Sequence, residues 1–144
     1  MCHRAHYLHD GREHRVAFAE AAARLPVRTR GGGTRLVAWG RRRQQEGTLP
    51  LGGWARLDAV TAGRWDRWFP RPVRIPLQGF TELDVEGREH VYELVRGQCV
   101  QGLLACDARR LLRVYIITVE PEIEDAIHAR WPRVIPLEAA TPPR

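Results

Sequence analysis

The sequence predicts an α+β domain in which a mainly antiparallel β-sheet is accompanied by a few short helices. Segments rich in β-branched and aromatic residues follow one another from residue 73 to residue 120, and the turns between them are short. Short turns join antiparallel neighbours, because a parallel pair needs a long crossover. Other segments show the helical spacing of apolar residues. With 144 residues, the chain has the length of one domain with a single core.

The first of the helical segments is residues 13–25, which are rich in alanine. Val16, Phe18 and Ala22 fall loosely on one face of a helix at this spacing. Proline lacks a backbone donor and clashes with the preceding turn, so Pro26 is expected to end the segment. We therefore predict a helix over residues 13–25.

Residues 26–40 read as two short strands around a glycine turn at residues 31–33. A loop rich in arginine and glycine continues to Gly53. In residues 54–69, aromatic and aliphatic side chains lie near helical spacing, interrupted by a glycine. We expect one or two short helical turns there, packing aromatic side chains.

The second half of the chain has the clearest strand pattern. Four strand-containing segments are expected, at residues 73–83, 90–97, 100–107 and 113–120. Residues 121–132 begin with Pro121 and three acidic residues and stop at Pro132, which is the polarity of a short helix. The tail, residues 137–144, is expected to be disordered.

The composition favours a polyanionic partner. The chain has 23 basic residues, all of them arginine, and 17 acidic residues, which gives a net charge of +6 and a pI of about 10.2. This balance is typical of proteins that bind nucleic acid. The longest apolar run, residues 114–119, is too short to span a bilayer, and no leader pattern opens the chain. We expect a soluble, cytoplasmic protein that does not bind membranes.

Three residue types are absent, and their absence restricts the chemistry. The chain has no lysine, serine or asparagine, which excludes a serine nucleophile and a lysine Schiff base. The α-amino group, with a pKa of about 8, is the remaining amine. Cys2, Cys99 and Cys106 form an odd set without a CxxC motif, so we expect reduced thiols and no disulfide.

Cys2 directly follows Met1, so removal of Met1 would expose an amine and a thiol on adjacent carbons. This 1,2-aminothiol condenses with an aldehyde in two steps. The amine first forms an imine, and the thiolate then closes a five-membered thiazolidine ring on the same carbon. An abasic deoxyribose presents such an aldehyde when its ring opens.

Further segments, in order along the chain, resemble the motifs of one known family. They are the opening MCHR and the blocks LVAWGRRR, WARLDAVTA, VRIPLQGFTEL, HVYEL with QGLLA, and VYIITVEPEIEDAIHARWP. In the last and most specific block, Thr118, His128, Arg130 and Pro132 are in register with the family signature. Over most of its length the chain resembles a shortened, divergent member of the SRAP (SOS response-associated peptidase) family.

The resemblance implies a SRAP-like domain over residues 1–136, with a curved, mainly antiparallel sheet or barrel. It implies a monomer that acts in DNA repair without a cofactor. This monomer would bind single-stranded DNA and crosslink Cys2 to an abasic site, which shields the site during the DNA damage response. Peptidase and abasic-site lyase activities also belong to the description of the family.

Carried over residue by residue, the resemblance makes Cys2 the nucleophile, Glu82 the acid/base carboxylate and His128 the group that polarises the sugar oxygen or the closing ring. A carboxyl and an imidazole are the groups that proteins tune for proton transfer near neutral pH. The arginines and tryptophans suit phosphates and exposed bases. The residues expected to contact DNA are Arg4, Trp39, Arg41, Arg42, Trp54, Arg56 and Arg130.

Two departures from the family pattern affect the site. Trp54 replaces an asparagine of the NAR segment, and His3 replaces a glycine beside the nucleophile. The region before LVAWGRRR also lacks a Y-N-x-A-P stretch. A DNA-binding protein that has lost crosslinking is therefore the main alternative.

Two further alternatives use the same terminus. A cysteine peptidase would combine Cys2, His128 and Glu82. A zinc site would use the nitrogen and sulfur ligands that crowd the first residues of the chain, although their spacing matches no standard finger. These ligands are Cys2, His3, His6, His9 and His14. We expect no metal.

Overall fold

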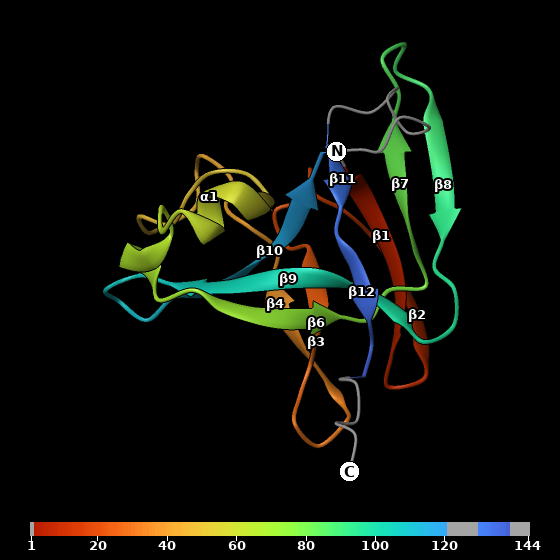
Figure 1. Cartoon of the computed structure of the whole chain (residues 1–144), viewed down its shortest axis with the longest axis horizontal. Helices are drawn as coiled ribbons and strands as arrows, with labels where there is room; N and C mark the ends of the chain where they lie inside the picture. The colour runs from red at the N-terminus through yellow and green to blue at the C-terminus, as the bar shows by residue number, and fades with distance from the viewer. Residues whose placement is uncertain (1, 121–129, 139–144) are drawn as a thin grey trace.

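The computed structural model describes residues 2–120 and 130–138 and consists mainly of β-strands (Figure 1). The strands are β1 (Cys2–His9), β2 (Arg12–Ala17), β3 (Arg24–Arg28), β4 (Thr34–Ala38), β5 (Trp54–Arg56), β6 (Arg71–Ile75), β7 (Gly79–Leu83), β8 (Glu89–Glu93), β9 (Gln98–Cys106), β10 (Leu112–Val119), β11 (Trp131–Pro132) and β12 (Val134–Pro136). The helices are α1 (Leu57–Thr61) and the 3-10 turn η1 (Asp66–Trp68).

The strands form three sheets. One has four antiparallel strands in the order β2-β1-β7-β8. The second has six strands, with β11-β10-β9-β12 as its path, β5 beside β10 and β6 beside β9. The third is the β3–β4 hairpin. Only β5 and β10 pair in parallel among the described strands, so the predicted mainly antiparallel architecture is confirmed, but within the described residues no sheet closes into a barrel.

The strand predictions agree well with the structure. Both strands around the glycine turn are present, and the four segments between residues 73 and 120 contain β6 to β10. The expected helical turns are α1 and η1, although β5 precedes them. Short turns join the antiparallel pairs β3–β4, β7–β8 and β9–β10. The strand β6 pairs with β9 and not with β7, the next strand along the chain.

The helix predicted over residues 13–25 is wrong, because this segment forms β2 and begins β3. Ala5 of β1 pairs with Val16, and Tyr7 pairs with His14. The pairing with β1 holds residues 12–17 in an extended strand, and the alanine-rich residues 18–23 form the turn that leads to β3. The strand β1 itself was not predicted.

Two other predictions fall partly on residues that the structure does not describe. Residues 121–129 of the helix expected over 121–132 lie outside the described residues, and β11 at the end of that range is extended rather than helical. Residues 139–144 of the expected disordered tail also lie outside them. Leu137 at its start is ordered, since its amide donates a hydrogen bond to the Gly97 carbonyl (2.8 Å).

Two hydrophobic clusters form the core. The larger packs the inner face of the four-stranded sheet against β3, β4 and the six-stranded sheet and contains Tyr7, Trp39 and Phe80. The smaller lies under α1 and η1 around Trp65 and Tyr115. The larger cluster brings the start of β1 to the end of β10, where Figure 1 places the amino terminus.

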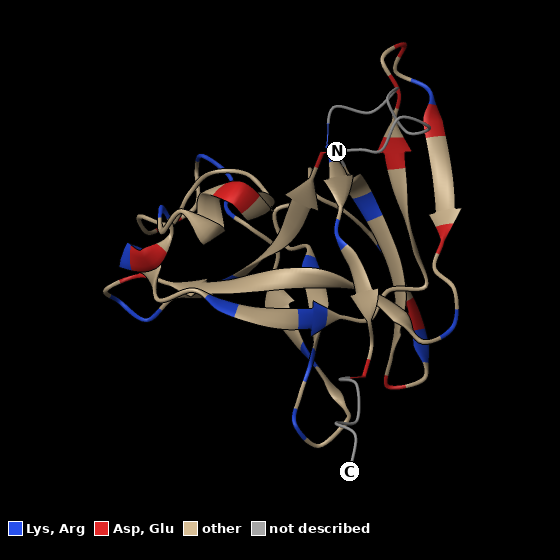
Figure 2. Ribbon diagram, in the orientation of Figure 1, with Lys and Arg blue, Asp and Glu red and all other residues tan. Residues whose placement is uncertain are grey.

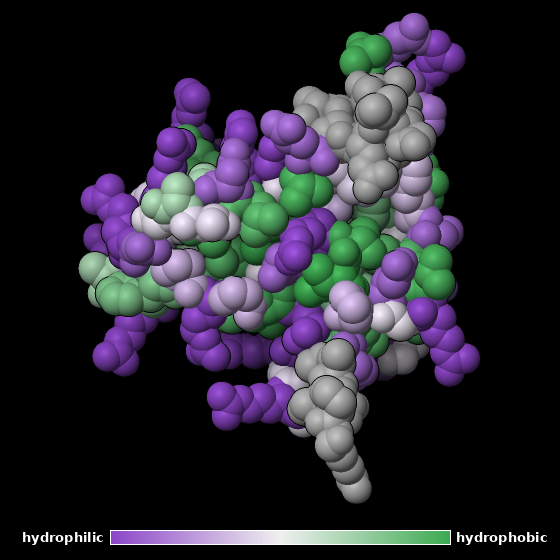
Figure 3. All heavy atoms as spheres, viewed as in Figure 1, coloured by the Kyte–Doolittle hydropathy of each residue, from purple (hydrophilic) through white to green (hydrophobic). Residues whose placement is uncertain are grey.

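Charge is unevenly distributed over the surface (Figure 2). The β7–β8 hairpin is acidic, with a single arginine, whereas basic residues dominate β3, β4, β6 and their loops. Hydrophilic side chains surround an apolar centre on the face seen in Figure 3. No helix in the described ranges is long and apolar enough to cross a bilayer.

Gly79 provides a test of the four-stranded sheet. A Cβ atom there would lie 2.4 Å from His6 Cε1 and 2.5 Å from the Tyr92 carbonyl oxygen. We expect Gly79→Ala to lower the free energy of unfolding by about 2 kcal/mol or more, because the backbone must shift. Gly31→Ala, where nothing lies within 4 Å, serves as the control. Equal denaturant midpoints for the two variants would contradict the β1–β7–β8 packing.

Candidate functional site

A β-bulge at the start of β1 places Cys2 opposite Glu82. Ala5 and Phe80 are register partners on the inner face of the sheet, so regular pairing would put His3 opposite Glu82 and turn Cys2 outward. The register shifts between Cys2 and Arg4, and Cys2 pairs with Glu82 instead. An extra residue in one strand re-aims the side chains beyond it. The bulge at His3 therefore brings together two of the three residues predicted for the chemistry.

Cys2 and Glu82 are both completely buried. Directly opposed residues of an antiparallel pair have Cβ atoms about 5 Å apart, so the thiol and the carboxyl are neighbours. Burial raises the pKa of Glu82 to about 7. Burial, together with the charge of Glu82, raises the pKa of the Cys2 thiol. Near neutral pH the Glu82 carboxyl can thus give or take a proton, while the Cys2 thiol stays protonated.

Trp54 holds the backbone of Cys2 in place. Its indole Nε1–H donates a hydrogen bond to the Cys2 carbonyl oxygen at 2.8 Å. The ring packs against Phe18 at 4.8 Å and against Trp39 at 6.3 Å between ring centroids. The large side chain at this position therefore still directs a donor toward the cysteine, although to its backbone.

Two arginines, Arg56 and Arg130, lie next to Thr118 near the end of β10. Arg130 donates from Nε to Thr118 Oγ1 (3.2 Å) and from a terminal nitrogen to the Thr118 carbonyl (2.7 Å). Arg56 on β5 is the register partner of Thr118 and is exposed. Its guanidinium binds Asp58 at 2.9 Å and lowers the pKa of that carboxyl to about 2. Arg56 and Arg130 thus both lie beside Thr118 on β10, the strand that pairs with the Trp54 strand β5.

Several residues expected to contact DNA have structural partners instead. Trp39 is fully buried and donates its indole N–H to the Gly53 carbonyl, so its ring is covered by protein in this structure. Arg41 donates to the carbonyls of Gln45 and Leu49. Arg42 donates to carbonyls of the preceding segments and lies 4.1 Å from the centroid of the Phe18 ring.

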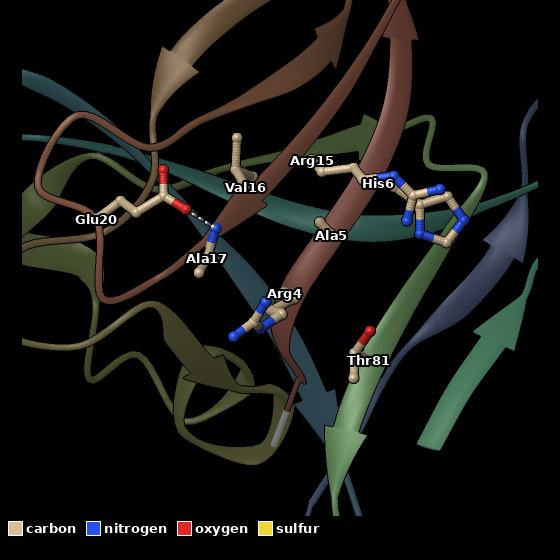
Figure 4. A pocket seen from close by; sticks show the side chains of 8 residues that line it. All are labelled: Arg4, Ala5, His6, Arg15, Val16, Ala17, Glu20 and Thr81. Carbon is tan, nitrogen blue, oxygen red and sulfur yellow. Dashed lines mark hydrogen bonds between the residues drawn. The ribbon is translucent and has the colours of Figure 1, made fainter. Parts of the chain in front are cut away.

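Arg4 lies on the outer face of the four-stranded sheet, opposite to the face that carries Cys2 and Glu82. Its side chain is 58% exposed, and its Nε is 3.4 Å from Glu89 Oε1. A shallow hollow of about 100 Å³ lies beside Arg4 (Figure 4). Its lining includes His6, Arg15 and Thr81 but none of the buried pair. The hollow is therefore separate from the candidate site.

His128, the third predicted catalytic residue, lies outside the described residues. His90 on β8, which the sequence analysis did not select, is the register partner of Glu82. Its Nε2 lies 2.8 Å from Asp84 Oδ2. The signal for His90 was its place in the HVYEL strand after a short turn, because such a hairpin pairs residues at predictable positions.

The amino-terminal histidines do not assemble into a metal site. Within residues 2–120 and 130–138, no group of three His, Cys, Asp or Glu side chains is arranged to hold a metal ion. His6 lies near Glu93 on the outer face, and His14 stacks on Tyr7 at 5.0 Å between ring centroids. Strand alternation separates the ligands that are close in sequence. The three cysteines are free thiols.

Comparisons with models of known protein families, with characterised proteins and with solved structures find no match.

Replacement of Glu82 by glutamine tests the shifted pKa. The pKa of the Glu82 carboxyl is about 7 in the folded chain and near 4.5 when the chain is unfolded. Between these pH values the carboxyl is protonated in the folded state and ionised in the unfolded state. Stability therefore decreases as the pH rises from about 4.5 to about 7. We expect Glu82→Gln to be more stable than the wild type at pH 8 by roughly 2 kcal/mol, and to match it near pH 4.

Chemical denaturation at the two pH values measures this difference. Glu13→Gln, at an exposed position of β2, should leave stability nearly unchanged at both. An equal effect of Glu82→Gln at pH 4 and pH 8 would mean that the Glu82 carboxyl is not perturbed by burial.

Replacement of Trp54 by phenylalanine tests the hydrogen bond to Cys2. The variant keeps an aromatic ring but loses the donor, so the free energy of unfolding should fall by about 1 kcal/mol more than in Trp68→Phe. Among the described residues, the Trp68 indole nitrogen has no hydrogen bond, which makes it a matched control. Hydrogen exchange of the β1 amides should also quicken in Trp54→Phe alone.

Proposed function

We propose that this protein binds single-stranded DNA and, after removal of Met1, forms a covalent thiazolidine crosslink between Cys2 and an abasic site. The observation that carries the proposal is the buried pair of Cys2 and Glu82, which the bulge in β1 places on one face. This pair sits at the residues that the resemblance to the SRAP family assigns as nucleophile and acid/base carboxylate. A SRAP-like domain is part of the same proposal.

The reaction requires an amine, a thiol and one group that both donates and accepts a proton. A methionine aminopeptidase hydrolyses the Met1–Cys2 bond. The freed amine adds to the sugar aldehyde, and protonated Glu82 gives its proton to the departing hydroxyl, so that water leaves and an iminium forms. The Glu82 carboxylate then takes the proton of the thiol. The sulfur bonds to the iminium carbon, which closes the ring and restores Glu82.

The raised pKa of the Cys2 thiol favours this chemistry over proteolysis. A cysteine peptidase uses a thiolate stabilised by a cationic neighbour, whereas a thiol buried beside a carboxyl is protonated and unreactive toward peptides. An iminium is a far stronger electrophile than an amide, and the transfer of the thiol proton to Glu82 accompanies its capture. The reaction also needs reduced thiols, which fits a cytoplasmic protein.

Electrostatics favour a DNA path over β5, β10 and β11. Arg56 and Arg130 lie on this side of Cys2, and arginine contacts phosphates well. Trp54 is half-buried next to them, so part of its ring is available to an unpaired base. The acidic β7–β8 hairpin on the other side would repel the backbone (Figure 2). The strand is therefore bound from one side of the site.

A DNA-binding protein without crosslinking is the second candidate. The complete burial of Cys2 favours it, because the sugar must reach this residue. Removal of Met1 takes away the residue attached to the Cys2 nitrogen, which makes the amine available under the first proposal. The two candidates share the DNA surface and differ in the covalent step.

The test is a crosslinking assay with protein whose amino-terminal cysteine is verified by mass spectrometry. Mixed with abasic single-stranded DNA, the wild type should give a band that resists denaturation, with a mass equal to the sum of the partners less one water. Cys2→Ala should give none. Glu82→Gln should react about 100-fold more slowly, which is typical for the loss of an acid/base group.

Cys106→Ala, which removes a partly buried thiol far along the chain, is the matched control and should crosslink at the wild-type rate. An equally strong crosslink in Cys2→Ala would overturn the proposal. Binding without a covalent product would support the second candidate. Cleavage of an unrelated peptide that depends on Cys2 would support the peptidase.

A further inference from the structure

The row of side chains that begins with Cys2 and Glu82 continues onto the next strand. Glu82 pairs with Cys2 on one side and with His90 on the other. Phe80 and Tyr92 form the next pair on the same face of β7 and β8, and their rings stack with centroids 5.7 Å apart. This stacking shows that Glu82 and His90 both lie on the inner face of the sheet. Thiol, carboxyl and imidazole thus stand at one level of three adjacent strands.

The far end of this row reaches solvent. Glu82 is completely buried, whereas the His90 side chain is 40% exposed. Asp84 adjoins His90 at 2.8 Å, and its own side chain is only 12% exposed. The other carboxylate oxygen of Asp84 accepts the amides of Glu86 and Arg88. A carboxylate fixed in this way orients the imidazole and stabilises it when protonated.

The proposed crosslinking reaction releases one proton when it begins from the ammonium form of Cys2. Ammonium, aldehyde and thiol become thiazolidine, water and one proton, and no electron is transferred. Glu82 is the group that takes protons from the amine and the thiol, but it has no exposed surface from which to pass them to water. A second group must therefore carry the proton out.

We propose that His90 transfers this proton between Glu82 and solvent. The inference rests on the proposed function. The His90 ring receives the proton that Glu82 has taken up, while Asp84 holds its Nε2 at 2.8 Å, and the ring passes a proton on to water. The charged side chains that face it are Glu82 on β7 and Asp84 in the turn that follows β7. Arg88 in the same turn acts on Asp84.

The experiment measures the single-turnover rate of crosslink formation to abasic single-stranded DNA. His90→Ala should lower this rate by about tenfold or more, and free imidazole in the buffer should restore much of it by occupying the space of the ring. His90→Gln should be equally slow but should not respond to imidazole. A glutamine retains a hydrogen bond to Asp84 and fills the space, so this variant separates proton transfer from structure.

His14→Ala is the matched control, because it removes another imidazole from the inner face at the opposite end of the sheet. It should crosslink at the wild-type rate with no response to imidazole. Thermal unfolding and affinity for intact single-stranded DNA should be similar in all four proteins. These two readouts detect a merely structural role.

The failures of the two proposals are distinguishable. If the wild type crosslinks and His90→Ala does so at the same rate, or is slow without recovery in imidazole, His90 is not the proton carrier and the proposed function stands. If the wild type forms no crosslink, the proposed function fails, and the role of His90 in it fails too.

Discussion

The bulge at His3 is the constraint on which the rest of the site depends. A strand alternates its side chains strictly, so a one-residue change of register exchanges the inner and outer faces. Because β1 gains one residue between Cys2 and Arg4, the cysteine turns inward while Ala5 and Tyr7 keep their places in the core. The hydrogen bond from Trp54 to the Cys2 carbonyl holds the bulged end. Without these two features the thiol would face solvent on the side of Arg4.

The burial of Glu82 raises its pKa and also lowers the stability of the fold when the carboxyl is ionised. A carboxyl without exposed surface is less stable when ionised, and its raised pKa reflects this penalty directly. A group that titrates near neutral pH is suited to proton transfer, whereas an ordinary surface glutamate is not. The burial of Glu82 therefore reduces the stability of the sheet when the carboxyl is ionised, a penalty that is common among desolvated groups at functional sites.

The arginines serve two purposes that composition alone does not separate. Arg41 and Arg42 donate to backbone carbonyls and connect the long loop before β5 to the core. Arg56 is exposed beside the end of β10, whereas Arg130 is partly buried there and donates to Thr118. The β7–β8 hairpin, in contrast, carries mostly acidic residues (Figure 2).

The sequence by itself determined the hairpins β3–β4, β7–β8 and β9–β10, because both partners of each pair lie close along the chain. It also predicted Cys2 and Glu82 as candidate site residues, from their residue types and the motif resemblance. Only the tertiary structure decided that residues 12–17 pair with β1 instead of forming a helix, since that choice depends on a strand with no periodic signature. It also decided which residue faces which. A bulge shifts register without marking the sequence, so the inward turn of Cys2 emerged only from the pairing of β1 with β7.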